Sequence, residues 1–218
     1  MTDAKTPVAV LVSGRGSNMA ALIAAAKNPA YPAKIVRVIS NRPDAGGLET
    51  AQAAGIETAV VDHKAFADKA AFEAALAQAI DDSGAELICL AGFMRVLSSA
   101  FVAHYPNRIL NIHPSLLPAF KGLDTHARAL AAGVKIHGCS VHLVSAELDA
   151  GPILMQAAVP VLAEDTADTL AARVLAEEHR IYPAALAALA SGRAQMENGM
   201  VTLSGGQLPT SLISPPLE

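Results

Sequence analysis

The chain has 218 residues, 52% of them hydrophobic, which is enough to bury a substantial core. Its formal net charge is −4, so no excess of basic residues points to nucleic acid as a partner. No apolar run is long enough to span a bilayer, the N-terminus lacks the pattern of a signal peptide, and two isolated cysteines make no disulfide framework. We therefore expect a cytoplasmic protein that binds neither nucleic acid nor membranes.

The first half of the chain alternates short apolar runs with helical patterns, as the buried strands and covering helices of a parallel sheet do. Strands are predicted over residues 7–12, 34–39, 57–61, 86–90 and 108–112. Helices are predicted over residues 19–27, 46–54 and roughly 67–82. This alternation predicts an α/β fold with a doubly wound, mostly parallel sheet.

The pattern changes after residue 113, where a loop rich in Pro and Gly leads into a short helix near 125–132. Two extended stretches follow, over 136–145 and 153–161, and we expect them to be antiparallel C-terminal strands.

A long helix is predicted over roughly 166–191, with a kink or break at Pro183. The dipeptide Asn198-Gly199 then predicts a small β-hairpin over about 195–203, because both residues accept the positive φ angles of a tight hairpin turn.

A glycine-rich turn, residues 13–18 (SGRGSN), stands between the first predicted strand and helix. The start of a helix offers free backbone N–H groups and the positive end of its dipole, which suit an anion. A dinucleotide site would have a third glycine where Met19 stands and an acidic residue near Ser40, Asn41 and Arg42. The turn therefore favours a monophosphate over NAD. Arg42 leaves an NADP-binding reductase as an alternative, and a glycine turn that binds nothing is another.

Asn111 and His113 stand two residues apart at the end of the fifth predicted strand, so their side chains share one side of it. Ligands bind at this carboxyl edge in open α/β sheets. An amide beside an imidazole suits acyl transfer, because the amide can donate to a developing oxyanion while the imidazolium delivers a proton. Asp149 is the candidate that orients the ring and keeps it charged. A purely structural Asn-x-His pair is the alternative.

Four segments in this order resemble the motif set of the folate-dependent formyltransferases: residues 13–18, 91–97, 111–118 and 147–153. The resemblance extends from about residue 8 to residue 208. It implies a Rossmann-like formyltransferase fold and an enzyme without a metal whose co-substrate is 10-formyltetrahydrofolate. The acceptor implied is the glycinamide amine of 5-phosphoribosylglycinamide, in de novo purine (IMP) biosynthesis.

The resemblance also implies roles for individual residues. His113 would be the general acid, Asn111 the ligand of the formyl oxygen and oxyanion, and Asp149 the residue that raises the pKa of His113. The substrate would be held by the phosphate turn and the long helix, through Gly16, Ser17, Asn18 and Glu178. The reduced folate would lie along two loops and near one lysine, against Met94, Arg95, Val96, Leu97, Asn111, Ser145, Ala146, Glu147, Leu148, Asp149 and Lys69. Family members often carry Arg at the position of Lys69, and the choice of Glu178 over Glu177 rests on the resemblance alone.

His137, Cys139 and His142 are residue types that can ligate a metal. In a strand, however, His137 and His142 face opposite sides, so we predict no metal there. His126 stays open between a residue that shapes the site and an exposed helix residue.

We expect one formyltransferase domain over residues 1–208, with a disordered tail over 209–218. Its phosphate-binding half covers about 7–112, its folate and catalytic half about 113–192, and the hairpin follows. Both a monomer and a homodimer are compatible with this expectation. A formyltransferase acting on aminoacylated tRNA would carry a further domain, for which 218 residues leave no room. A 10-formyltetrahydrofolate hydrolase is the other rival within the family, and it would also carry a further domain.

Overall fold

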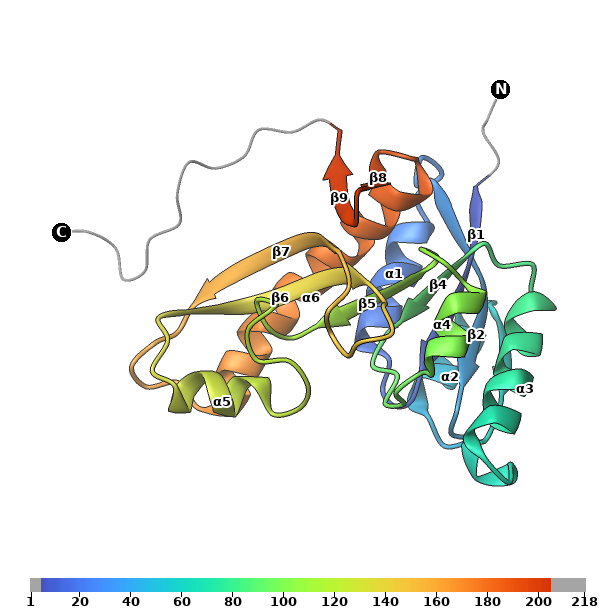
Figure 1. The fold of residues 1–218 in the computed structure, drawn as a ribbon, viewed down its shortest axis with the longest axis horizontal. Helices are drawn as coiled ribbons and strands as arrows, with labels where there is room; N and C mark the ends of the chain where they lie inside the picture. The colour runs from blue at the N-terminus through green and yellow to red at the C-terminus, as the bar shows by residue number, and fades with distance from the viewer. Residues whose placement is uncertain (1–4, 205–218) are drawn as a thin grey trace.

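A computed structural model describes residues 5–204, and the tail predicted over 209–218 lies outside the described residues. Seven strands form one sheet in the order β3-β2-β1-β4-β5-β6-β7 (Figure 1). Their bounds are β1 (Thr6–Val12), β2 (Ala33–Ser40), β3 (Glu57–Val60), β4 (Leu87–Leu90), β5 (Ile109–His113), β6 (Ile136–Leu143) and β7 (Ile153–Pro160). The pairs among β1 to β5 are parallel, whereas β6 and β7 are antiparallel to their neighbours. The predicted fold class is confirmed.

Helices cover both faces of the sheet (Figure 1). Their bounds are α1 (Ser17–Ala26), α2 (Gly46–Ala53), α3 (Lys69–Asp81), α4 (Ser99–His104), α5 (Thr125–Ala131) and α6 (Ala167–Ala190). Buried side chains of α1 and α6 join one core cluster, and those of α3 and Phe101 of α4 join the other. The β1 run Val8–Val12 is inaccessible to solvent, because both faces of this strand are covered. None of the helices in residues 5–204 is long and apolar enough to cross a membrane.

Helix α4, of six residues, was not among the predicted elements. The side chain of Ser98 caps it by accepting a hydrogen bond from the backbone N–H of Phe101. Phe101 and Tyr105, four residues apart, bury their rings on the same side. A serine followed by two aromatic residues four positions apart is the pattern in the sequence that indicates this helix.

Of the kink or break predicted at Pro183, the break is wrong, because α6 continues through that residue to Ala190. Tyr182, Ala185 and Leu186 are all inaccessible to solvent on either side of the proline. Packing of this stripe against the sheet holds the helix together although the proline removes one backbone hydrogen bond.

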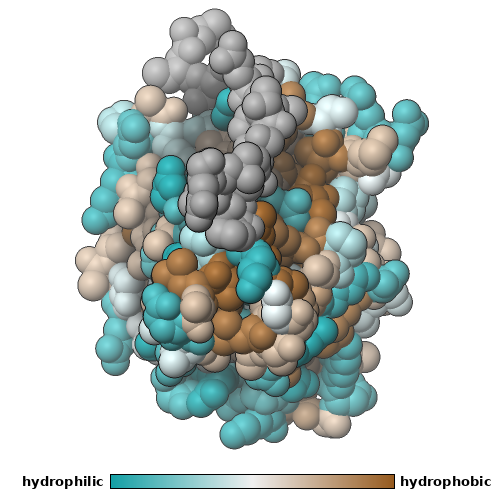
Figure 2. Space-filling model, turned by 90° about the vertical axis from the view of Figure 1, so that its left-hand side faces the viewer, coloured by the Kyte–Doolittle hydropathy of each residue, from teal (hydrophilic) through white to brown (hydrophobic). Residues whose placement is uncertain are grey.

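The predicted hairpin is confirmed as β8 (Ala194–Glu197) and β9 (Met200–Leu203), which pair in antiparallel fashion. Asn198 and Gly199 have φ angles of 50° and 78°, as a two-residue hairpin turn requires. The hairpin follows the end of α6 (Figure 1). On the face seen in Figure 2, hydrophobic residues gather toward the middle and hydrophilic residues surround them.

The order of the strands reverses between β1 and β4, because the chain first builds outward to β3 and then returns to the other side of β1. Loops that leave these two neighbours run in opposite directions and open a crevice at their carboxyl ends. The strand order therefore fixes where a ligand site can form.

Candidate active site

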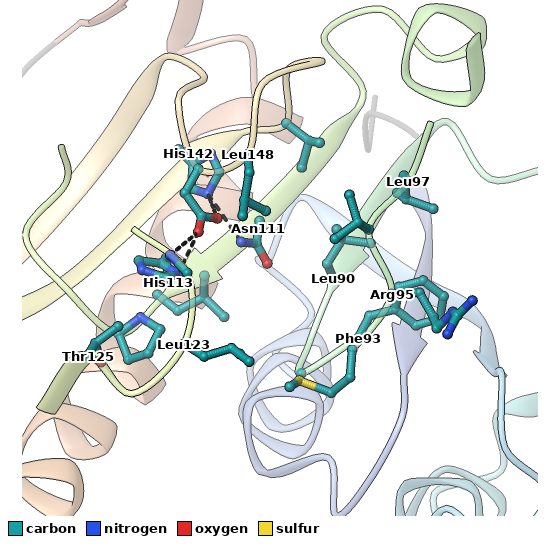
Figure 3. Close-up of a pocket in the computed structure, with 18 of the residues that line it drawn as sticks. Leu90, Phe93, Arg95, Leu97, Asn111, His113, Leu123, Thr125, His142 and Leu148 are labelled. Carbon is teal, nitrogen blue, oxygen red and sulfur yellow. Dashed lines mark hydrogen bonds and ion pairs between the residues drawn. The ribbon is translucent and has the colours of Figure 1, made fainter. Parts of the chain in front are cut away.

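A cavity of about 760 Å³ opens at the carboxyl ends of β4 and β5 (Figure 3). Three loop segments supply most of its wall: residues 92–97, 122–126 and 144–149. Asn18 of α1 and Glu178 of α6 also line it. Met94, Val96, Leu123 and Leu148 are exposed hydrophobic side chains in this wall. A large, mostly apolar cavity with a few convergent polar groups is the usual form of a small-molecule site.

The imidazole of His113, labelled in Figure 3, and the carboxylate of Asp149 meet inside this cavity. Nδ1 of His113 lies 3.4 Å from Oδ2 of Asp149, and each side chain is only 8% exposed. On the other side of the ring, Nε2 lies 3.1 Å from the carbonyl oxygen of Phe120. A carbonyl only accepts hydrogen bonds, so Nε2 is the donor in this contact. The ring therefore lies between two groups that accept hydrogen bonds, a carbonyl at Nε2 and a carboxylate beside Nδ1.

Asn111 lies beside these two residues and is held by a second histidine. Its Nδ2 atom lies 3.1 Å from Nε2 of His142, the residue directly opposite on β6. Nε2 of His142 is also 3.8 Å from Oδ1 of Asp149. The structure thus brings Asn111, His113 and Asp149 together as predicted, and adds His142. His142 was expected only as a possible metal ligand; the register that places it opposite Asn111 is the signal that would have identified it.

Asp149 reaches the cavity from an unusual backbone conformation. Its φ angle is 48°, in the left-handed region that aspartate tolerates better than most residues. Oδ2 of Asp149 accepts a hydrogen bond of 2.9 Å from the backbone N–H of Gly122. Gly151 follows two residues after Asp149. It lies so close to the end of β6 that a Cβ atom there would be 1.8 Å from the carbonyl oxygen of Leu143. Glycine at 151 is therefore a condition for the position of Asp149.

Gly151→Ala is expected to displace this turn, to destabilise the fold by about 1–3 kcal/mol and to lower kcat by about tenfold or more. Urea unfolding and steady-state kinetics measure the two effects. The matched control is Gly46→Ala, because a Cβ atom at Gly46 would meet no atom within 4 Å. Equal stability of both variants would contradict the close approach.

The glycine-rich turn leads into α1 as predicted. Gly16 has a φ angle of 75° and precedes the helix, and no side chain among the described residues caps the helix start. A Cβ atom on Gly16 would lie 3.1 Å from the Cα atom of Gly47, so the turn packs tightly against α2. The backbone N–H groups of the first helical turn stay available to an anion.

Asn18 joins this turn to the long helix α6. Its Nδ2 atom donates a hydrogen bond of 2.6 Å to Oε2 of Glu178. Burial raises the pKa of Glu178, and the hydrogen bond from Asn18 opposes that rise. Glu177 instead forms an ion pair with Arg180, at 2.8 Å, and does not line the cavity. The structure therefore distinguishes Glu178, which lines the cavity, from Glu177, which does not.

The cavity wall over residues 92–97 is tied to the same turn through Ser13. The hydroxyl of Ser13 accepts a hydrogen bond of 2.8 Å from the backbone N–H of Met94 and donates one of 2.6 Å to Asn41. Met94, Arg95, Val96 and Leu97 all line the cavity, as do Ser145 and the three residues after it.

Three residues predicted for ligand binding are not part of the cavity wall: Gly16, Ser17 and Lys69. Gly16 and Ser17 directly precede Asn18, which is in the wall. Lys69 begins α3 and lies 3.7 Å from Glu73, with its side chain 47% exposed. The carboxylate of Glu73 in turn accepts a hydrogen bond from the backbone N–H of Ser98, at the end of the wall segment.

His137 belongs to a separate buried cluster. Its ring packs edge-to-face against the rings of Phe120 and His126, with centroids 5.7 and 5.3 Å away. His126 lines the cavity and is half-buried, so it shapes the site rather than lying on an exposed surface. His142 instead faces Asn111 (Figure 3) and lies near Asp149. Within residues 5–204, no group of three or more His, Cys, Asp or Glu side chains is placed to hold a metal ion.

Acid is expected to destabilise the fold through His137. Burial lowers the pKa of His137 to about 4 from the ordinary value of 6.5. The unfolded chain therefore binds a proton at this residue below pH 6.5, whereas the folded chain does so only near pH 4. The free energy of unfolding should fall across that interval, with His137 contributing a loss of about 2 kcal/mol at pH 5.

Urea unfolding at pH 7 and pH 5 measures this loss. In His137→Leu, the difference between the two pH values should shrink by about 2 kcal/mol. His104→Leu serves as the control, because His104 is exposed. A difference that is the same in His137→Leu and the unmodified chain would contradict the expectation.

Comparison with known proteins identifies relatives of this fold and site. Residues 6–186 match the protein family described as formyl transferase. The chain is 47% identical over 202 residues to phosphoribosylglycinamide formyltransferase of Escherichia coli, covering 93% of this chain and 95% of that protein. It also resembles the crystal structure of glycinamide ribonucleotide transformylase 1 from Symbiobacterium toebii, with a TM-score of 0.89 and 47% identity, over 91% of this chain and 94% of that one.

One part of a longer relative is similar to this chain. The chain is 50% identical over 192 residues to the trifunctional purine biosynthetic protein adenosine-3 of Gallus gallus, covering 88% of this chain. It spans 19% of the length of that protein. Because the family match covers most of the chain and includes β1 to β7, it agrees with the strand order and the converging residues described above. The chain belongs to the formyl transferase family.

Proposed function

We propose that the chain is an enzyme that transfers the formyl group of 10-formyltetrahydrofolate to the glycinamide amine of 5-phosphoribosylglycinamide. This reaction belongs to de novo purine (IMP) biosynthesis, and we place it in the cytoplasm. The observation that carries the proposal is that Asn111, His113 and Asp149 converge in one cavity that also contains Asn18 of the anion-binding turn. Kinship with the E. coli enzyme supports the choice of substrates.

His113 acts as the general acid in this proposal. The contacts of its two ring nitrogens, with Asp149 and with the Phe120 carbonyl, suit the charged ring that can give up a proton. Asp149 pairs with that charge and fixes the orientation of the ring. Asn111 donates a hydrogen bond to the formyl oxygen as negative charge develops there. The attacking amine is a good nucleophile when unprotonated, so no covalent intermediate on the protein is required.

The turn and α6 hold the phosphorylated substrate. Backbone N–H groups at Gly16, Ser17 and Asn18 bind the phosphate, aided by the helix dipole. Glu178 contacts the ribose, where a buried carboxylate can accept hydrogen bonds from hydroxyl groups. These roles place the amine of the substrate toward Asn111 and His113.

The reduced folate occupies the rest of the cavity, because the size and the apolar lining of the cavity suit a flat heterocycle. When bound, it supplies the formyl group. Met94 to Leu97 and Ser145 to Asp149 would hold it, and Lys69 would lie toward its acidic end. We also propose that one domain, residues 1–208, carries both the phosphate-binding half and the catalytic half.

Incubation of the full chain with 10-formyltetrahydrofolate, with and without 5-phosphoribosylglycinamide, tests the proposal. We expect folate release that requires the amine and matches the formylated product one to one. Glycinamide riboside, which lacks the phosphate, is the matched control. Its kcat/KM should be at least about 100-fold lower, because the anion-binding turn then has no partner.

Other outcomes point to the rivals. Folate release without the amine would indicate a 10-formyltetrahydrofolate hydrolase. Binding of NADPH without folate turnover would indicate a reductase that uses Arg42. Either result would contradict the transferase.

A further inference from the structure

The imidazole of His142 is fixed in one tautomer by its own strand. Nδ1 of His142 lies 2.9 Å from the carbonyl oxygen of Leu143. A carbonyl oxygen can only accept a hydrogen bond, so Nδ1 carries the proton. In the neutral ring the other nitrogen, Nε2, is then a bare acceptor.

That acceptor determines how the amide of Asn111 is turned. Nε2 of His142 can bond only to the NH₂ group of Asn111, which lies 3.1 Å away, and would repel the amide oxygen. Figure 3 shows the Asn111 nitrogen toward His142 and the oxygen directed away from it. The amide therefore presents its oxygen and one remaining N–H to ligands in the cavity.

The neutral state of His142 also affects Asp149. The two carboxylate oxygens lie near two imidazoles, at 3.4 Å from Nδ1 of His113 and at 3.8 Å from Nε2 of His142. A charged His142 would compete for the carboxylate and place a second positive charge beside His113. A neutral His142 leaves Asp149 paired with His113.

We propose that His142 is a positioning residue for formyl transfer: as a neutral imidazole anchored on the Leu143 carbonyl, it orients the Asn111 amide and leaves Asp149 to His113. The inference rests on the proposed function for its kinetic consequences. Its tautomer can be measured without any substrate. Asn111 and His113 remain the groups that touch the reactants.

Protonation of His142 should therefore disturb the site in acid. The titratable groups that act on His142 are Asp149 from the turn after β6 and His113 from β5. Glu178 of α6 and His126 of α5 line the same cavity, and the partner of His142 on β7 is Ile153, which does not titrate. Burial lowers the pKa of His142, so its ring is neutral at pH 7. Below that pKa, Nε2–H would force the Asn111 amide to turn over.

Nitrogen-15 NMR of the imidazoles tests the tautomer in the free protein. The chain has 7 histidines, and the signal of His142 is the one that disappears in His142→Gln. At pH 7 we expect a protonated Nδ1 and an unprotonated Nε2. A proton on Nε2, in either the other tautomer or the imidazolium, would overturn the inference even if the enzyme proves to be a transferase.

Two substitutions of His142 test in steady-state kinetics whether an acceptor at the position of Nε2 is what the site requires. His142→Gln can place an amide oxygen where Nε2 stood, whereas His142→Asn reaches only as far as Nδ1 and removes the acceptor. We expect kcat of the Gln variant to stay within about threefold of the unmodified chain at pH 7.5. The Asn variant should lose about tenfold or more in kcat, with KM for 10-formyltetrahydrofolate changed less. Equal losses in both variants would overturn the inference.

The pH profile supplies a readout that a merely structural role would not move. The ratio of kcat in the unmodified chain to kcat in His142→Gln cancels titrations that both share, including that of the substrate amine. We expect this ratio to be constant above pH 6.5 and to fall below it, because only the unmodified chain carries His142. His104→Gln is the matched control at an exposed histidine, and its ratio should stay flat. A flat ratio for His142→Gln as well would contradict a titrating His142.

Discussion

His113→Ala is expected to lower kcat by at least about 10²-fold, the usual contribution of a general acid. The substitution removes the group that gives a proton to the departing folate nitrogen, and it leaves Asp149 with a charge but no partner at 3.4 Å. KM for either substrate should change far less, because the anion-binding turn and the apolar wall remain. Steady-state kinetics with both substrates measure the change, and near-normal turnover would remove His113 from the reaction.

The control for this variant is His104→Ala. His104 is exposed at the end of α4, on a helix that does not contribute to the cavity. Its activity should equal that of the unmodified chain. Circular dichroism and urea unfolding of both variants ensure that a loss of activity is not a loss of fold.

Asp149→Asn is expected to cut kcat by a similar factor, about 10²-fold or more. The amide keeps the size of the carboxylate but removes the negative charge that pairs with the His113 ring. An amide oxygen can still accept the hydrogen bond from Gly122 N–H, so the loop keeps its anchor. Asp149→Ala removes both the charge and the anchor, and should therefore also weaken substrate binding.

The comparison between these two variants separates the two roles of Asp149. A loss of kcat in both, with an added rise in KM only in Asp149→Ala, is the expected pattern. Asp82→Asn is the matched control, because Asp82 is exposed after α3 and bonds only to Gln78 among the described residues. An active Asp149→Asn would show that the charge is dispensable and would contradict the proposed mechanism.

Much of the fold follows from local patterns in the sequence. Apolar runs marked all seven strands of the sheet. The signal is clearest for central strands such as β1 and β4, because strands buried on both faces admit few polar residues. The hairpin followed from Asn198-Gly199, whose positive φ angles few other dipeptides accept. Pro183 shows the limit of such reasoning, since long-range packing of α6 decided the outcome there.

The candidate site was predictable only where its residues are near in sequence. Asn111 and His113 share a strand, and their common side follows from strand geometry. Their contacts with Asp149 and His142 depend on the register between β5 and β6 and on a turn with a positive φ angle. Neither the register nor the turn could be worked out from local spacing. The same holds for Glu178, which its place in the cavity wall and its hydrogen bond from Asn18 distinguish from Glu177.

The hydrogen bond between His113 and Phe120 has a consequence for how this loop can vary. Its acceptor is a main-chain oxygen, so no exchange of the side chain at position 120 deletes it directly. Phe120 has a φ angle of 54°, so the condition on this position concerns backbone shape more than side-chain chemistry. Alanine scanning would miss this partner of the imidazole, whereas a β-branched residue at 120, which strongly resists that φ angle, would expose it.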